Sequence, residues 1–273
     1  MKLSLLLFSI LFANGILAQN NDEIQLHGSL ITIELGTDGI VVCADSRAMI
    51  MKDGRPYAYF DSVAKITQVR GIIFGTTGVA NLGHRNLLNL ARQIENKIDW
   101  NHATLSFIIN YVRAIKAMFS VEEIELLKEN DFVVASYINN KPAIYEFTLQ
   151  DLMDNSQIHP MRTYYVTAAP AVKYLKYDST ATCKKLAKLA ERAIYKYSKE
   201  FLVDYSVGGP ISVVQIMPNG QVNWIKNRFD TLGRTDWIQL QASGKILLKF
   251  VDPEKLKLSD SLIRQYKREH PRS

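Results

Sequence analysis

The sequence predicts an α+β fold in which mainly antiparallel sheets carry helices on their faces. Two observations predict it: the strand-like segments come in pairs joined by turn signals, and the helical segments come in groups. The chain has 273 residues, 47% hydrophobic and 22% charged, which is typical of a globular protein with a substantial core. Because no linker rich in Pro, Gly or Ser divides the chain, we expect one domain.

The N-terminal half begins with two predicted hairpins. The first joins SLITIEL and IVVCA across an Asp-Gly turn at 36–39, and the second joins 64–69 to 72–77. Two amphipathic helices are expected next, because apolar residues recur at helical spacing. These residues are Leu87, Ala91, Ile94 and Ile98 in the first helix, and Leu105, Ile108, Ile109 and Val112 in the second.

The C-terminal half adds further strands and one strongly periodic helix. Strands are expected over 131–138, 143–148 and 163–168. The helix that follows has one apolar face, formed by Leu186, Leu189, Ala190, Ala193, Ile194 and Tyr197. A last hairpin joins ISVVQIM and QVNWIK around Pro218-Asn219-Gly220. After residue 227 the pattern weakens, and a short helix is expected near 258–268.

Residues 1–18 have the layout of a secretory signal peptide. Lys2 precedes an apolar run from Leu3 to Ala13, and small residues lead to Ala18. The alternative is an uncleaved membrane anchor, although the run is shorter than the roughly 20 residues that a span needs. We therefore expect an exported protein, periplasmic or secreted, with no membrane association after cleavage.

Composition and motifs weaken several function classes. The net charge of +6 is spread along the chain, so nucleic-acid binding has no support. Two cysteines, Cys43 and Cys183, exclude a disulfide scaffold and a paired-cysteine zinc site. Export permits a disulfide between them, but their apolar surroundings favour two buried thiols. The paired acids Glu122-Glu123 are expected on a solvated helix face.

Sequence motifs of the common cofactor and hydrolase classes are absent. None of the five histidines stands at the spacing of a helical metal pair. The chain also has no GxSxG, GxGxxG or GxxxxGK motif. We expect no cofactor and no metal.

The most informative segment is HGSLITIELGTDGIVVCADSRAM, residues 27–49. In it Asp45-Ser46-Arg47 stands 16 positions after Ser29, and Lys65 begins the next strand pair. Further along are GTTGVAN (75–81) and Asp204 in DYSVGG. With these residues in this order, the chain resembles the β subunits of the proteasome, which are N-terminal nucleophile (Ntn) hydrolases. The resemblance covers residues 29–226.

The resemblance implies a four-layer αββα sandwich and an active site at a new N-terminus. Autocatalytic cleavage of Gly28-Ser29 would make Ser29 the nucleophile, with its own α-amino group as the base. An α-amine has an ordinary pKa of about 7.7–8.0 and suits this task without a histidine. The other implied roles are Lys65 as electrostatic activator, Asp45 as its orienter, Arg47 as a brace, an N–H near Gly78 for the oxyanion, and Asp204 as a late acid.

Each of these residues also has a structural interpretation. Ser29 would begin an edge strand, Asp45 and Arg47 would pair at a strand end, Lys65 would protect a sheet edge, and Asp204 would cap a turn.

The chain also departs from the family pattern. Serine replaces threonine at 29, and TAAP (167–170) and Val207 replace two supporting serines, with Ser206 one place away. The interval from Lys65 to Gly78 is one residue shorter than in the family pattern, so the oxyanion donor is the N–H of Gly78 or of Val79.

Together these inferences divide the chain into four parts. They are a signal peptide (1–18), a short propeptide (19–28), an Ntn-hydrolase domain (29–250) and a basic C-terminal tail (251–273). The expected substrate is a peptide or small amide, and the family's rings imply a homo-oligomer. The alternatives are an inactive fold that acts as an assembly or binding module, and an amidase of small molecules with the same mechanism.

Overall fold

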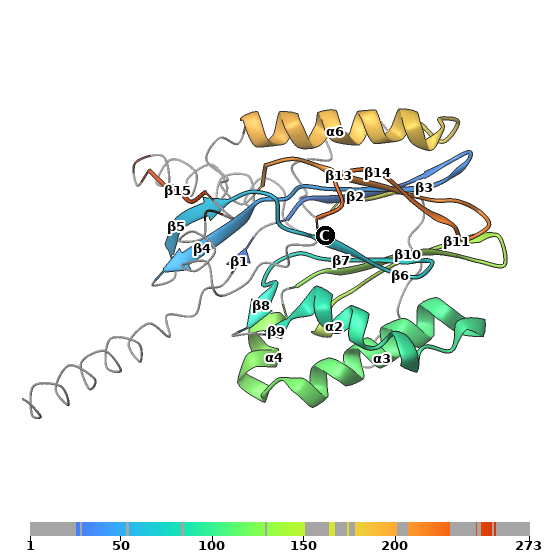
Figure 1. Ribbon diagram of the computed structural model, residues 1–273, viewed down its shortest axis with the longest axis horizontal. Coiled ribbons are helices and arrows are strands. Elements are labelled where there is room, and N and C mark those ends of the chain that lie inside the picture. Colours follow the sequence, from blue (N-terminus) through green and yellow to red (C-terminus); the bar gives the residue numbers. More distant parts are fainter. Residues whose placement is uncertain are drawn as a thin grey trace, which may run out of the picture.

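The computed structural model has four layers, with helices on the outside and two sheets between them (Figure 1). It describes residues 26–27, 29–52, 55–82, 85–128, 130–150, 164–166, 174, 178–200, 207–229, 244, 247–252 and 254. The predicted α+β class and the αββα order are confirmed. The signal segment, Gly28, Asp204 and the helix expected near 258–268 lie outside these residues.

The first sheet has the order β12-β2-β3-β13-β14, and every pair in it is antiparallel. Its strands are β2 (Ile31–Gly36), β3 (Gly39–Ala44), β12 (Tyr164–Val166), β13 (Ser212–Ile216) and β14 (Val222–Lys226). The β2–β3 hairpin closes at the pair Gly36↔Gly39, so the predicted Asp-Gly turn is confirmed. The predicted hairpin around residues 218–220 is confirmed as well.

The second sheet has the order β11-β10-β7-β6 and is also antiparallel. Its strands are β6 (Ile66–Val69), β7 (Ile72–Thr76), β10 (Phe132–Ile138) and β11 (Lys141–Phe147). Alternate residues from both sheets meet in an aliphatic core that includes Ile33, Val42, Ile73, Val133 and Val214.

One long helix covers the first sheet and a group of helices covers the second. Helix α6 (Cys183–Glu200) packs Leu186, Ala190, Ile194 and Tyr197 onto β2, β3 and β13. Cys43 and Cys183 lie in this layer as free, buried thiols, as expected. The second sheet is covered by α2 (Leu87–Gln93), α3 (Ala103–Met118) and α4 (Val121–Leu127). An aromatic cluster of Phe74, Phe107, Tyr111 and Phe132 joins α3 to the sheet.

Two helix predictions need correction. The first helix ends at Gln93 rather than near residue 98, and the 3-10 turns η1 (Glu95–Lys97) and η2 (Trp100–His102) follow it. In α3 the aromatic residues fill the buried face, so Leu105 and Ile109 are exposed while Ile108 and Val112 are buried.

The prediction for Glu122-Glu123 is also partly wrong. Ser120 and Glu123 form a capping box at the start of α4, and Glu123 also pairs with Arg85. Of the two acids, Glu122 is exposed and Glu123 is half-buried.

A third hairpin lies beside the sandwich and was missed in the sequence (Figure 1). It consists of β4 (Ala48–Lys52) and β5 (Arg55–Phe60), with β1 (Leu26–His27) and β15 (Lys249–Phe250) at its edges. Its sequence signal is Asp53-Gly54 between two strand-like runs. The remaining strands are the short pair β8 (Asn81–Leu82) and β9 (Arg85–Asn86). In the described ranges no helix is long and apolar enough to span a membrane.

Candidate active site

Close packing across the two sheets brings together the segments that carry Ser29, Lys65 and Gly78. A Cβ at Gly75 would lie 2.8 Å from Ile31 Cδ1 and 3.0 Å from Ile66 Cγ2. Only glycine therefore lets the end of β7 approach the starts of β2 and β6 this closely. Ser29 lies just before β2, Lys65 just before β6, and Gly78 just after β7. The three sequence-predicted residues thus share one end of the sandwich.

Asp45 ties three chain segments together at this end. Its side chain is fully buried and accepts hydrogen bonds from the N–H groups of Leu30 (2.8 Å), Arg47 (3.1 Å) and Gly208 (3.0 Å). Burial raises the pKa of Asp45 to about 6, while the Lys65 charge and the three N–H groups oppose this rise. The bond from Leu30 fixes the backbone next to Ser29.

Lys65 is buried with only 4% of its surface exposed. It therefore does not act as the solvent-facing guard of a sheet edge, and that interpretation is wrong. Burial lowers the pKa of its ammonium group, and the Asp45 charge partly restores it. An amine of lowered pKa close to a carboxylate is the kind of perturbed pair that clusters at functional sites.

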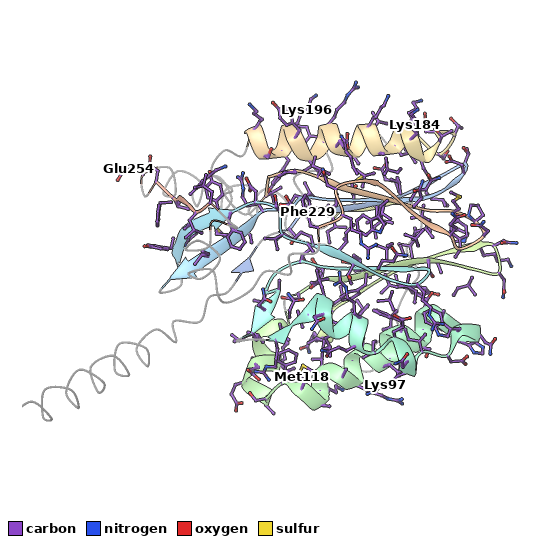
Figure 2. The ribbon with its side chains drawn as sticks, in the orientation of Figure 1. Lys97, Met118, Lys184, Lys196, Phe229 and Glu254 are labelled. Atoms are coloured by element: carbon purple, nitrogen blue, oxygen red, sulfur yellow. The ribbon has the colours of Figure 1, made fainter. Side chains whose placement is uncertain are left out.

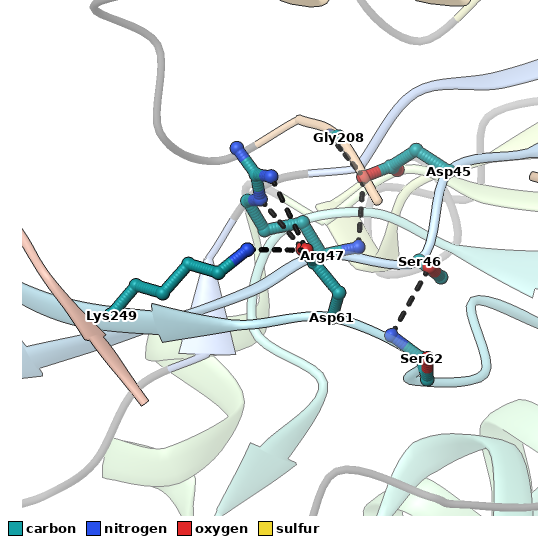
Figure 3. A network of polar contacts seen from close by, with 7 residues as sticks. All are labelled: Asp45, Ser46, Arg47, Asp61, Ser62, Gly208 and Lys249. Atoms are coloured by element: carbon teal, nitrogen blue, oxygen red, sulfur yellow. Dashed lines mark hydrogen bonds and ion pairs between the residues drawn. The ribbon is translucent and has the colours of Figure 1, made fainter. Parts of the chain in front are cut away.

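Arg47 connects this end of the sandwich to the β4–β5 hairpin (Figure 3). Its Nε donates to Asp61 Oδ1 at 2.8 Å, and its guanidinium lies 4.2 Å from the centre of the Tyr59 ring. Lys249 Nζ is 3.5 Å from Asp61 Oδ2. Arg47 thus has a bracing role that does not use Asp45 as an ion-pair partner.

The Gly208-Gly209 segment packs directly on Ser46 and Arg47. Ser46 N–H donates to the Gly208 carbonyl at 3.0 Å, and a Cβ at Gly208 would lie 2.6 Å from Arg47 Cζ. Gly209 has φ +75, and a Cβ there would lie 2.7 Å from Ser46 Oγ. Gly209 therefore requires glycine, and Gly208 favours it because its φ of +155 is rare for other residues and a Cβ would displace the Arg47 guanidinium. Ser46 Oγ also accepts from Ser62 N–H at 3.2 Å, which holds Ser62 at the uncommon φ of 73°.

The turn after β7 is held by Asn130, which the sequence did not single out. Asn130 Oδ1 accepts from Val79 N–H at 2.9 Å, and its Nδ2 donates to the Val79 carbonyl at 2.7 Å. Gly78 has φ +78, and a Cβ there would lie 2.4 Å from Asn130 Oδ1. Val79 N–H is occupied, whereas Gly78 N–H has no acceptor among the described residues, so Gly78 is the available donor of the two candidates.

The remaining candidates are not all placed. Gly28 and Asp204 lie outside the described residues, as do Ser206 and the TAAP segment. Val207 is described, and it is buried in the apolar layer under α6. Within the described ranges no group of three or more His, Cys, Asp or Glu side chains could hold a metal ion.

Comparison with known proteins supports the fold but not a specific family. No protein-family model matches the chain, and no curated protein matches it. Among solved structures, it is similar to a Gly-1 mutant of Anbu from Hyphomicrobium sp. strain MC1, a proteasome-like protein. The TM-score is 0.52 at 12% identity, over 90% of this chain and 98% of the other. The chain therefore has a fold that is distantly similar to that of a proteasome-like protein.

Proposed function

We propose that the chain is an Ntn-type hydrolase of amide or peptide bonds with Ser29 as its nucleophile. One observation carries the proposal: buried Asp45 accepts a hydrogen bond from the residue after Ser29 and shares its surroundings with buried Lys65. Two buried ionisable groups are costly to the fold. Asp45 and Lys65 lie near the start of β2, where they can assist a reaction at Ser29.

The proposed reaction uses the α-amino group of a mature Ser29 as general base. The amine takes the Oγ proton while Oγ attacks the substrate carbonyl carbon, and the Lys65 charge favours the developing alkoxide. Gly78 N–H donates to the oxyanion. The C–N bond then breaks, the leaving amine takes the proton, and water hydrolyses the ester on Ser29. Asp45 keeps Lys65 charged and in place.

We also propose that Ser29 is released by cleavage of the Gly28-Ser29 bond. Two contacts support this step. Upstream, His27 pairs with Met49 in the β1–β4 ladder, and downstream Leu30 N–H binds Asp45. The chain on both sides of the bond is therefore held, which favours reaction at one position. Export by residues 1–18, assembly into a homo-oligomer, and a peptide or small amide as substrate belong to the same proposal.

Intact mass and turnover test this function together. The full chain, expressed by its native export route, is expected to begin at Ser29, whereas a Ser29→Ala variant keeps the preceding residues. Lys65→Ala should lower kcat by at least about 100-fold on a fluorogenic peptide, the size expected for loss of one electrostatic contact to a developing negative charge. Lys188→Ala is the matched control, since Lys188 is an exposed lysine on α6.

A non-catalytic assembly or binding module is the second candidate. Val207 favours it, because an apolar side chain occupies the place where the family pattern has a supporting serine. A parent chain that begins at Gln19, with the same N-terminal residue in the Ser29→Ala variant, would select this candidate.

A further inference from the structure

A cavity of about 540 Å³ lies between the C-terminal half of α6 and the β13–β14 pair. Its volume falls within the range of small-molecule pockets. Its lining shares no residue with the nucleophile, activator or oxyanion donor proposed above. The cavity is therefore a second candidate site, which borders the candidate active site at Gly209.

Positive charge dominates the lining of this cavity. Arg192, Lys196 and Lys226 contribute three cations, against one carboxylate from Glu191. Lys226 Nζ is paired with Glu191 Oε1 at 2.7 Å. Arg192 and Lys196 form no ion pair with any residue that the structure describes. Two cations without an ion-pair partner in the described part of the chain are therefore available to attract an anion.

The opposite wall is apolar and held in position. Pro210 and Ile211 contribute it, and the exposed ring of Tyr195 lies at the same cavity. Asn227 Nδ2 donates to the Ile211 carbonyl at 2.8 Å, which ties the wall to the end of β14. Such a pocket offers an apolar surface together with two charged donors, the combination that orients a small ligand.

We propose that this cavity binds a small organic anion, a carboxylate or phosphate group on an apolar or aromatic body. Arg192 and Lys196 bind the anionic group, since a guanidinium and an ammonium both donate to carboxylate and phosphate oxygens. The body of the ligand packs on Tyr195, Pro210 and Ile211. Glu191 limits the affinity because its charge faces the same space.

The backbone that lines the cavity is directly connected to the candidate active site. The cavity wall begins at Gly209, and the N–H of the preceding residue, Gly208, donates to Asp45. A ligand that restrains this wall therefore also restrains one of the three hydrogen bonds to Asp45. Binding itself does not depend on the proposed hydrolase activity.

Calorimetric titration of the full chain with phenyl phosphate, benzoate, inorganic phosphate and benzyl alcohol tests the proposal. Saturable binding of phenyl phosphate or benzoate at one site is expected, and the stronger of the two identifies the anionic group. Inorganic phosphate should bind more weakly because it lacks the apolar body, and benzyl alcohol should not bind. Absence of saturable binding by both aromatic anions would overturn the proposal.

Matched variants locate the site. The double variant Arg192→Gln with Lys196→Gln should weaken binding by about tenfold or more, as expected for lost charge-assisted hydrogen bonds. The control, Lys184→Gln with Lys188→Gln, removes the same charge from the same helix. Lys184 lies near the opposite end of α6 from Lys196 (Figure 2), so binding should be unchanged. Glu191→Gln should tighten binding. Equal weakening in both double variants would assign the effect to general charge attraction and refute the site.

Discussion

The pH dependence of folding should reveal one buried carboxyl group, that of Glu34 on β2. Glu34 has no exposed surface, and neither of its carboxylate oxygens has a hydrogen-bond partner among the residues that the structure describes. Burial raises its pKa from 4.5 to about 7. Each tenfold change in proton affinity corresponds to about 1.4 kcal/mol, so full ionisation of Glu34 lowers the free energy of unfolding by roughly 3 kcal/mol.

The sign follows from proton binding. The folded chain holds the Glu34 proton more tightly than the unfolded chain does, so the contribution of Glu34 to stability is greatest at low pH. It is lost progressively as the pH rises from 4.5 to about 7. Glu34→Gln cannot ionise and should lack this loss. At about pH 8 the variant should therefore be more stable than the parent chain, by up to roughly 3 kcal/mol.

Urea unfolding at a series of pH values between about 5 and 8.5 measures this difference. Asp45 is present in both proteins, so its titration cancels in the comparison. Glu122→Gln is the control, because Glu122 is exposed on α4, and it should keep the dependence of the parent chain. If the parent and Glu34→Gln lost stability in parallel across this range, the reasoning from burial would be refuted.

Three further substitutions test the packing of the site and one helix. Gly78→Ala should destabilise the chain by about 3 kcal/mol or more in urea unfolding, because it adds a φ penalty and a collision with Asn130; a loss below about 1 kcal/mol would contradict this. Arg47→Lys should lower the melting temperature by a few degrees, because lysine cannot donate through two nitrogens to Asp61; an unchanged value in differential scanning calorimetry counts against the bracing role. Ser120→Ala should cost about 1 kcal/mol through loss of the α4 cap, while any turnover stays at the parent level; reduced turnover would indicate an unrecognised link between α4 and the site.

Local sequence signals predicted the elements that form the sandwich. The Asp-Gly turn at 36–39 and the Asn-Gly turn at 218–220 correctly marked two hairpins, because such turns need residues that tolerate φ > 0. The β4–β5 hairpin had the same signal at Asp53-Gly54. No strands were predicted there.

The contacts around the candidate site depend on distant segments and could not be predicted from local patterns. Asn130 holds a turn 51 positions away, and Gly208 binds Asp45 across 163 positions. The sequence placed Asp45 and Lys65 in plausible roles, but it gave no indication of their burial. The burial of Glu34 could not be predicted either. Glu34 lies in an alternating strand pattern, in which a polar residue is normally expected to face solvent.

The hydrogen bond between Gly208 and Asp45 also has a consequence for the timing of the proposed cleavage before Ser29. A ribosome completes strand β3 long before residue 208 emerges, so an early folding intermediate has an Asp45 that lacks one of its three donors. Contacts of such long sequence separation form late, because loop closure must precede them. Self-cleavage before Ser29 would then report that the last hairpin has docked. In refolding experiments, the cleaved mass should appear only after the far-ultraviolet circular dichroism signal has recovered.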